Sequence, residues 1–283
     1  MKKIIVTGDD FGLAKPINEA IIEAHQRGIL TAASLMVGTE FSQDAIQRAL
    51  RLTSLKIGLH LVLVEGRSIL APRDIPDLVD AEGEFSSQLT RSGFKYFFYH
   101  GIRRQLEAEI RAQFEAFSKT GLRLDHVNAH NHLHLHPTIM RLILKVGKEY
   151  GLRAVRLPHE PPLRSWKASR KSFGSKVATW FLLRPWIALM KRMLRQSHIS
   201  HNDFLFGMAD SGAMSQDLVL RFLRNLPDGV TEIYFHPATC RCKEIDRTMP
   251  LYRHEDEFRV LTSNLVSRAV QEAGVQRIAF SDI

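Results

Sequence analysis

Imidazole and carboxylate side chains, the groups that bind metals and carry protons, gather at a few points of this chain. Five of the thirteen histidines lie between residues 126 and 136, Asp9 and Asp10 are adjacent, and His60 and His236 stand apart from the other histidines. Two histidines and a carboxylate with open coordination positions make a catalytic metal site, whereas structural zinc sites are closed, commonly by cysteine. The pattern therefore predicts a catalytic site for one divalent metal ion.

Two neighbouring aspartates can divide two tasks at such a site, because successive side chains of a strand point in opposite directions. One aspartate binds the metal, and the other takes a proton from the attacking water. On the far side a positioned histidine can protonate a leaving amine, and His236 suits this role, with a hydrogen bond that caps a strand end as the alternative. The candidates for contacting a substrate are Arg156, for which a structural ion pair is the alternative, and the later histidines His132 and His134.

Short β-type runs alternate with longer amphipathic runs along the whole chain. The predicted strands are Lys3–Thr7, Ala32–Val37, Lys56–Leu63, His126–His132, Ala154–Leu157, Glu232–His236 and Arg277–Phe280. The predicted helices are Pro16–Arg27, Ser42–Leu52, Ile102–Lys119, Thr138–Tyr150, Gln216–Asn225 and Asp256–Glu272. This alternation is typical of parallel strands joined by crossover helices. We therefore expect an α/β fold in a single domain of residues 1–283. The expected architecture is a distorted (β/α) barrel, either complete or incomplete. A doubly wound open sheet is the alternative.

The carboxyl ends of the strands of a barrel meet at one face, where such enzymes build their sites. The first predicted strand leads into Asp9 and Asp10, the third contains His60, the fourth enters residues 126–136, and the sixth ends at His236. We therefore expect these side chains, which are far apart in the sequence, to lie together. A nucleotide site of the Rossmann type is disfavoured, because the first turn lacks G-x-G-x-x-G and its two carboxylates would repel a phosphate.

Residues 161–202 carry nine basic residues, all three tryptophans of the chain and no acid, so the net charge of +9 resides there. We expect a basic, amphipathic helical insert that Pro185 breaks into two short helices. Its apolar stripe comprises Leu182, Trp186, Leu189, Met190 and Met193. Such a segment suits binding to a membrane surface. The alternative is a helical hairpin packed on its own domain. Nucleic acid is not expected as a partner.

The 283 residues are 45% hydrophobic and 24% charged, which is the balance of a globular protein. The apolar runs fall short of the ~20 residues that cross a bilayer, and the one before Asp9 is too short for a secretory signal. We therefore expect a cytoplasmic protein, either free or peripheral on the inner face of the membrane. Two cysteines, Cys240 and Cys242, are too few for a disulfide scaffold.

Five motifs together resemble the YdjC-like carbohydrate deacetylases in order and spacing over nearly the whole chain. They are Thr7-Gly8-Asp9-Asp10-Phe11-Gly12, Gly58-Leu59-His60-Leu61, the run His126–Pro137, Arg156-Leu157-Pro158 and Phe235-His236-Pro237. The resemblance implies a distorted barrel related to polysaccharide deacetylases, and metal-assisted hydrolysis of the N-acetyl group of an amino sugar. Carried over residue by residue, it makes the metal ligands Asp10, His60 and His130, the general base Asp9 and the general acid His236.

One departure from the family pattern concerns the surroundings of the metal ligands. Many members have aspartate where this chain has Asn128, which still accepts a hydrogen bond but carries no charge. The metal affinity or metal preference is therefore expected to differ. Zinc suits two histidines and one carboxylate, and magnesium and manganese are the alternatives.

Within the family, the run Asn128–Pro137 and the basic insert resemble the hopanoid-biosynthesis-associated branch. This resemblance implies a substrate in which N-acetylglucosamine is attached to a hopanoid lipid, and an enzyme acting on a lipid benefits from an interfacial anchor. Deacetylation of soluble chito-oligosaccharides is the alternative. A non-enzymatic metal- or lipid-binding protein is an alternative of another class, since it needs the histidine run but neither Asp9 nor His236.

Overall fold

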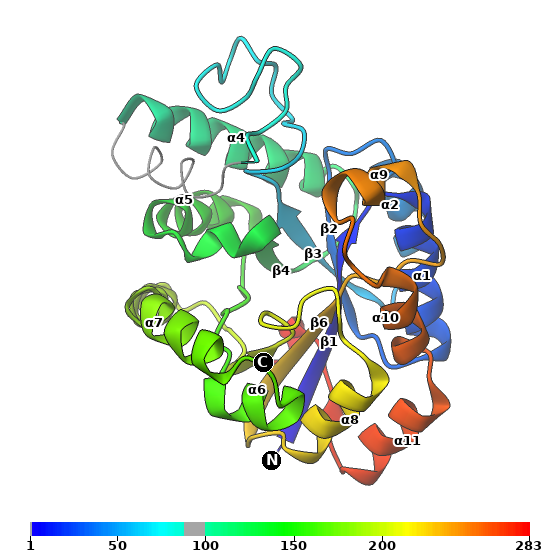
Figure 1. Cartoon of the computed structure of the whole chain (residues 1–283). Helices are drawn as coiled ribbons and strands as arrows, with labels where there is room; N and C mark the ends of the chain where they lie inside the picture. The colour runs from blue at the N-terminus through cyan, green and yellow to red at the C-terminus, as the bar shows by residue number, and fades with distance from the viewer. Residues whose placement is uncertain (1, 88–99) are drawn as a thin grey trace.

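Parallel strands form the centre of the computed structural model, which describes residues 2–87 and 100–283 (Figure 1). The strands are buried along most of their length, as expected for strands that face a packed barrel interior on one side and helices on the other. The strands in the described residues are β1 (Lys2–Phe11), β2 (Ala32–Leu35), β3 (Lys56–Leu61), β4 (Leu124–Ala129), β5 (Phe204–Phe206), β6 (Gly229–Phe235) and β7 (Gln276–Arg277). Regular pairing follows the order β4-β3-β2-β1-β6-β5, and β7 pairs with β1.

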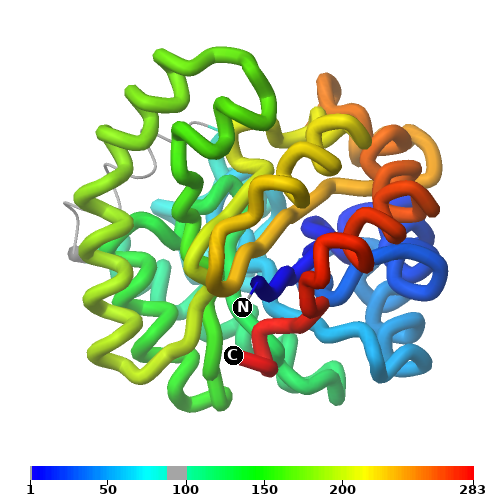
Figure 2. Tube along the Cα trace, turned by 90° about the horizontal axis from the view of Figure 1, so that it is seen from below, coloured from blue at the N-terminus to red at the C-terminus, as the bar shows by residue number. Residues whose placement is uncertain are grey.

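The sheet curls into a barrel that regular pairing leaves open between β4 and β5. Isolated bridges fill part of this gap, since Val155 bridges to β4 and Ala154 bridges to Ser200. Asn202 adds hydrogen bonds to both backbone groups of Leu157. At the amino end of the barrel, β7 pairs with the first half of β1 and brings the two termini of the chain near each other (Figure 2).

Helices surround the strands in both views of the chain (Figures 1 and 2). They are α1 (Lys15–Arg27), α2 (Ser42–Leu50), α4 (His100–Ser118), α5 (Pro137–Gly147), α6 (Pro162–Ser169), α7 (Phe173–Gln196), α8 (Gln216–Arg224), α9 (Lys243–Thr248), α10 (His254–Leu261) and α11 (Asn264–Glu272), and the 3₁₀ turns are η1 (His130–Leu135), η2 (Lys148–Tyr150) and η3 (Phe280–Asp282). α8 illustrates why these segments are helical. The Ser215 side chain accepts a hydrogen bond from the first turn, and Leu218 and Phe222, four residues apart, are buried on one face.

The parallel α/β barrel expected from the sequence is confirmed, with local corrections. Ala154–Leu157 forms isolated bridges instead of a strand, whereas β5, with three residues, is too short for the pattern to have revealed it. The histidine run leaves the sheet after Ala129, because Asn131 and His132 adopt left-handed backbone with φ of 52° and 53°. The predicted helix Asp256–Glu272 is divided between α10 and α11.

The basic segment 161–202 contains α6 and α7, but the expected break at Pro185 is wrong. α7 continues through Pro185 as one helix, and the break lies before it, where Arg170 and Ser172 have left-handed backbone. Packing of the inner face offsets the cost of the proline, since this face buries Ile187, Met190 and Leu194. None of the helices in the described ranges is long and apolar enough to cross a membrane.

Replacing Pro185 by alanine is expected to raise the free energy of unfolding by about 2 kcal/mol. A proline inside a helix costs about 3 kcal/mol because it removes a hydrogen bond, and its restriction of the unfolded chain returns up to about 1 kcal/mol. Chemical denaturation followed by circular dichroism measures the change. Pro162, in the first turn of α6, is the matched control. Proline removes no helical hydrogen bond in the first turn, so Pro162→Ala should not raise the free energy of unfolding. Equal gains at both positions would contradict this explanation.

Candidate metal centre

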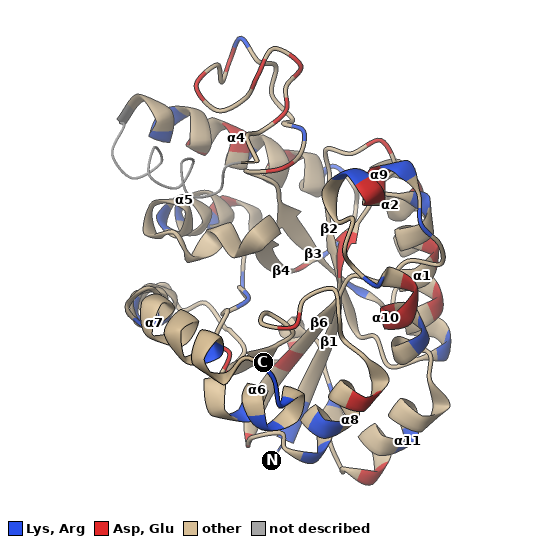
Figure 3. Cartoon of the chain, in the orientation of Figure 1, with Lys and Arg blue, Asp and Glu red and all other residues tan. Residues whose placement is uncertain are grey.

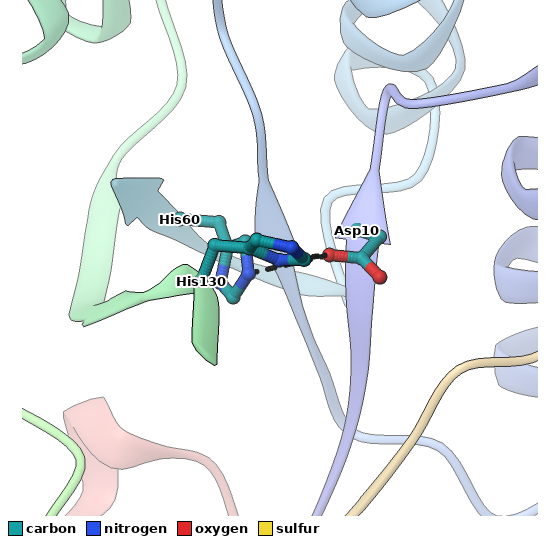
Figure 4. Close-up of side chains that lie close together, drawn as sticks. All are labelled: Asp10, His60 and His130. Carbon is teal, nitrogen blue, oxygen red and sulfur yellow. Dashed lines mark ion pairs between the residues drawn. The ribbon is translucent and has the colours of Figure 1, made fainter. Parts of the chain in front are cut away.

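The carboxyl end of β1 carries two aspartates whose side chains take different directions. Asp10 has a left-handed backbone with φ of 62°, and the pairing of β1 with β2 is irregular at this point. Aspartate tolerates this conformation better than most residues, and strained backbone of this kind clusters at functional sites. Asp10 reaches His60 of β3 and His130 at the end of β4 (Figure 4). Asp9 instead contacts Arg156.

Asp10, His60 and His130 form a buried cluster that fits a metal ion. One ligand atom of each residue lies within 4.8 Å of the others. Asp10 Oδ1 is 3.3 Å from His60 Nε2 and 3.3 Å from His130 Nδ1. Both oxygens of Asp10 are buried, and no hydrogen-bond donor among the described residues satisfies them. A buried carboxylate in this state is costly without a cation, and one carboxylate with two imidazoles is a ligand set for zinc and similar ions.

Charge within the cluster sets the protonation of its members. Burial by itself would raise the pKa of Asp10, but the adjacent His130 and His60 rings lower it well below its usual range. Burial by itself would lower the pKa of His130, and the Asp10 carboxylate raises it above its usual value. Glu65 adds negative charge, with Oε2 3.9 Å from His130 Nε2. A proton therefore competes with a cation for His130.

Asp9 lies beside the cluster and is held by Arg156. The Arg156 side chain is entirely buried, and its Nη2 donates to Asp9 Oδ1 at 2.9 Å and to Glu232 Oε1 at 2.6 Å. Burial by itself would raise the pKa of Asp9, but the positive charge of Arg156 lowers it well below its usual range. Asp9 is therefore an ionised, oriented carboxylate in the neutral pH range.

His236 follows β6 and lines the same cavity as the metal cluster. Its backbone is fixed on both sides, since its N–H donates to Glu257 at 2.6 Å and its carbonyl accepts from His254 Nδ1 at 2.6 Å. Burial lowers the pKa of His236 to about 4, against the opposing charges of Asp10 and Asp9. The ring is therefore neutral at pH 7 before reaction, and its protonated form is a strong acid.

The cluster opens into a cavity of about 270 Å³. Aromatic and polar side chains line it, including Tyr234, Tyr252 and Ser211. His132 belongs to this wall, with its Nε2 3.0 Å from the Tyr234 hydroxyl. A concave site with a few convergent polar groups is the usual form of a small-molecule site.

His134 and Arg156 lie behind the cavity wall. The His134 ring is entirely buried, its Nδ1 accepts from the Ala129 N–H at 3.1 Å, and its Nε2 donates to the Arg156 carbonyl at 3.1 Å. Burial and the charge of Arg156 lower the pKa of His134 to about 3, so the ring is neutral. Of the residues expected to contact substrate, the structure brings His132 to the cavity, while His134 and Arg156 support the residues around it.

Several residues of the site were not identified from the sequence, among them Glu232, Tyr234 and Glu257. Glu232 is the charged residue of an otherwise uncharged strand, β6, and this contrast is the signal that could have identified it. Tyr234, two residues later on the same strand, carries the hydroxyl that meets His132. Glu257 offers no comparable signal, because its contact with the backbone of His236 joins two elements that only folding brings together.

Comparison with known proteins identifies the family. The family profile described as YdjC-like protein matches residues 3–272. The chain belongs to the YdjC-like family. It is 29% identical over 282 residues to a carbohydrate deacetylase of Brevibacillus brevis, covering 99% of each chain. A carbohydrate deacetylase of Geobacillus stearothermophilus is 28% identical over 280 residues, which cover 98% of this chain and 96% of that relative.

Solved structures share the architecture of this YdjC-like protein. A crystal structure of an Enterococcus faecalis protein, named for cellobiose-phosphate cleavage, matches with a TM-score of 0.78 and 25% identity over 99% of this chain and 98% of that one. A lactam utilization protein of Thermus thermophilus matches with a TM-score of 0.52 and 14% identity, covering 98% of this chain and 99% of that one. The second likeness concerns the fold alone.

Metal affinity of this YdjC-like protein is expected to rise with pH. Because Asp10 holds a proton on His130 above the ordinary histidine pKa of about 6.5, a cation must displace that proton, and binding weakens as the pH falls. Calorimetric titration with Zn²⁺ across the neutral range measures both affinity and proton release. His130→Ala should lose at least ~100-fold in affinity, and His25→Ala, at a histidine of α1 that is not a ligand in this assignment, serves as the control. Wild-type affinity in His130→Ala would rule out the assigned ligand set.

Proposed function

We propose that this chain is a metal-dependent hydrolase that removes the N-acetyl group from an N-acetylglucosamine unit of a lipid-linked substrate at a membrane surface. The observation that carries the proposal is the buried cluster of Asp10, His60 and His130, with the ionised Asp9 beside it at the same cavity. Relatives named carbohydrate deacetylase that match almost the full length support the reaction class. Zinc is the favoured ion, with magnesium and manganese as alternatives.

Each residue of the site has a separate role in amide hydrolysis. A divalent cation held by the cluster supplies Lewis-acid chemistry, since it polarises the acetyl carbonyl and makes the attacking water more acidic. Asp9 accepts a proton from the attacking water. His236, neutral before reaction, relays that proton to the nitrogen of the departing amine as the C–N bond breaks, and the products are acetate and a glucosamine unit. Arg156 orients Asp9, and His132 contacts the substrate from the cavity wall.

A second cavity supports an apolar group on the substrate. It has a volume of about 290 Å³ and lies between α6, α7 and the segment 208–210. Trp180, Leu183 and Ile187 of α7 contribute apolar walls, and Met208 lines both this cavity and the one above the metal cluster. The shared residue Met208 supports the proposal that an apolar aglycone extends from a sugar at Asp9 toward α7, although the Lys176–Asp210 ion pair also lines this cavity. A soluble chito-oligosaccharide has no such group to place there.

The surface of α6 and α7 supports contact with a membrane. Leu182 and Phe181 are 71% and 61% exposed, and Leu163, Trp166, Phe173 and Trp186 are exposed as well. Of the expected apolar stripe, Leu182 and Trp186 are exposed, whereas Met190 is buried. Lys and Arg lie along the same helices (Figure 3). Apolar side chains among cations suit an anionic bilayer, so we propose that segment 161–202, an insert in the single domain 1–283, binds the inner face of the membrane.

Acetate release from defined substrates tests the proposal. An N-acetylglucosaminyl lipid in anionic vesicles should be deacetylated with a higher kcat/KM than a soluble chito-oligosaccharide, and only with a divalent metal. A preference for the soluble oligosaccharide would instead favour the soluble-substrate alternative. Absence of acetate with zinc, magnesium and manganese alike would favour a non-enzymatic metal- or lipid-binding protein.

Asp9→Asn is expected to retain metal and lose turnover by about 10²–10⁴-fold, the usual contribution of a general base. Asparagine keeps the shape of the side chain but cannot accept the proton of the water. Zinc titration and acetate release measure the two effects separately, and circular dichroism checks the fold. Asp217→Asn, on the exposed side of α8, is the matched control. Near-normal turnover in Asp9→Asn would exclude Asp9 as the base.

Vesicle binding is expected to depend on the exposed residues of α7. Replacing Phe181 and Leu182 together by glutamate removes the apolar side chains and adds charge that anionic headgroups repel, so co-sedimentation with anionic vesicles should fall at least ~10-fold. Leu251→Glu is the control, because Leu251 is 91% exposed but lies outside the insert. Turnover of a soluble substrate should stay unchanged in both proteins. Equal losses of vesicle binding in both would argue against α7 as the anchor.

A further inference from the structure

Asn128 joins the metal ligands to the general base. Its Oδ1 lies 2.7 Å from His60 Nδ1, and its Nδ2 donates to Asp9 Oδ1 at 3.2 Å and to Ser34 Oγ at 2.9 Å. Because a carboxylate such as Asp9 only accepts, the amide nitrogen must face Asp9 and the amide oxygen must face His60. His60 therefore carries its proton on Nδ1, and the lone pair of Nε2 is directed toward Asp10.

The hydrogen bonds continue from Asn128 into the interior of the barrel. Ser34 Oγ accepts from Asn128, so its own hydrogen is free for His126 Nε2 at 3.1 Å. The His126 Nδ1–H then donates to Asp125 Oδ2 at 2.9 Å. The other oxygen of Asp125 accepts the Ser281 N–H of the C-terminal turn η3 at 2.9 Å. Every bond from the metal ligand to Asp125 thus runs in one direction.

Packing leaves little freedom to this relay, the chain of hydrogen bonds from Asn128 through Ser34 and His126 to Asp125. Ser34, His126 and Asn128 have no exposed surface, and water has no access from which to replace a lost bond. The His126 ring stacks on Phe280 of η3, with ring centroids 4.4 Å apart. A Cβ on Gly58 would lie 2.4 Å from His126 Cε1, so only glycine at that place of β3 leaves room for the ring.

We propose that the relay Asp125–His126–Ser34–Asn128 positions His60 as a metal ligand, with Ser34 and His126 as positioning residues. The proposal rests on the metal site of the proposed function. Hydrogen bonds from the outer nitrogen of a ligating histidine fix its tautomer and its ring orientation. Through Asp125, the relay connects His60 to the C-terminal turn η3 at the opposite end of the barrel. It also explains why an amide suits position 128, since an aspartate there would bring a second carboxylate against Asp9 and could not donate to Ser34.

Ser34→Ala and His126→Phe break the relay while keeping the buried shapes. In the metal-free protein at alkaline pH, long-range ¹H–¹⁵N NMR should show His60 as a single Nδ1-protonated tautomer in the wild type and in both variants, because Asp9 still orients the Asn128 amide. The affinity of both variants for Zn²⁺ should fall about 10–100-fold, the usual effect of losing such a partner. His126→Gln, which retains an acceptor for Ser34 and a donor for Asp125, should bring the affinity to within about 3-fold of wild type.

Ser68→Ala is the matched control, because Ser68 is also buried and hydrogen-bonded but lies outside the relay. Unchanged zinc affinity in Ser34→Ala would overturn the proposal, even if His126→Phe failed to fold. So would a loss of affinity in Ser68→Ala as large as that in Ser34→Ala, since it would point to general destabilisation. Both readouts are made without substrate, so the result is independent of whether the protein deacetylates a sugar.

Discussion

Arg156 lies entirely inside the barrel between Asp9 and Glu232, and the state of the site follows from this ion pair. One guanidinium between two carboxylates keeps Asp9 ionised where burial by itself would favour its neutral form. Thr7 completes the arrangement by donating to Glu232 at 2.7 Å. Removing one member of a buried ion pair commonly costs about 3–5 kcal/mol, because the remaining charge is left without a partner. Stability and the ionised state of Asp9 therefore depend on the same contacts.

The metal cluster depends on a second constraint, the place where each strand ends. β1 and β4 both give way to left-handed backbone, at Asp10 and at Asn131 and His132. Regular strands would have carried these side chains on alternately to the barrel interior and to the surrounding helices. The departures bring carboxylate and imidazole groups to one cavity, and Asn128 connects His60 to Asp9. The candidate metal ligands and the candidate base thus share one hydrogen-bonded framework.

The helices α6 and α7 line a cavity on one side and form part of the protein surface on the other. The inner face of α7 packs against α5, α6 and η1, while its outer face exposes apolar side chains among cations. The cavity lies between α6, α7 and residues 208–210, and it shares the lining residue Met208 with the cavity above the metal cluster. In the function proposed above, this segment has two roles, which are binding the bilayer and receiving an apolar group beside the sugar.

The order of strands and helices, the parallel barrel and the approach of Asp10, His60 and His130 were predictable from the sequence. Alternating periodicities reveal the elements, and the strand ends of a parallel barrel converge whatever the details of packing. The directions of Arg156 and His134, the passage of α7 through Pro185 and the relay behind His60 were not predictable. Each of them depends on which way a side chain points and on partners distant in the sequence, and these are settled only when the elements pack against one another.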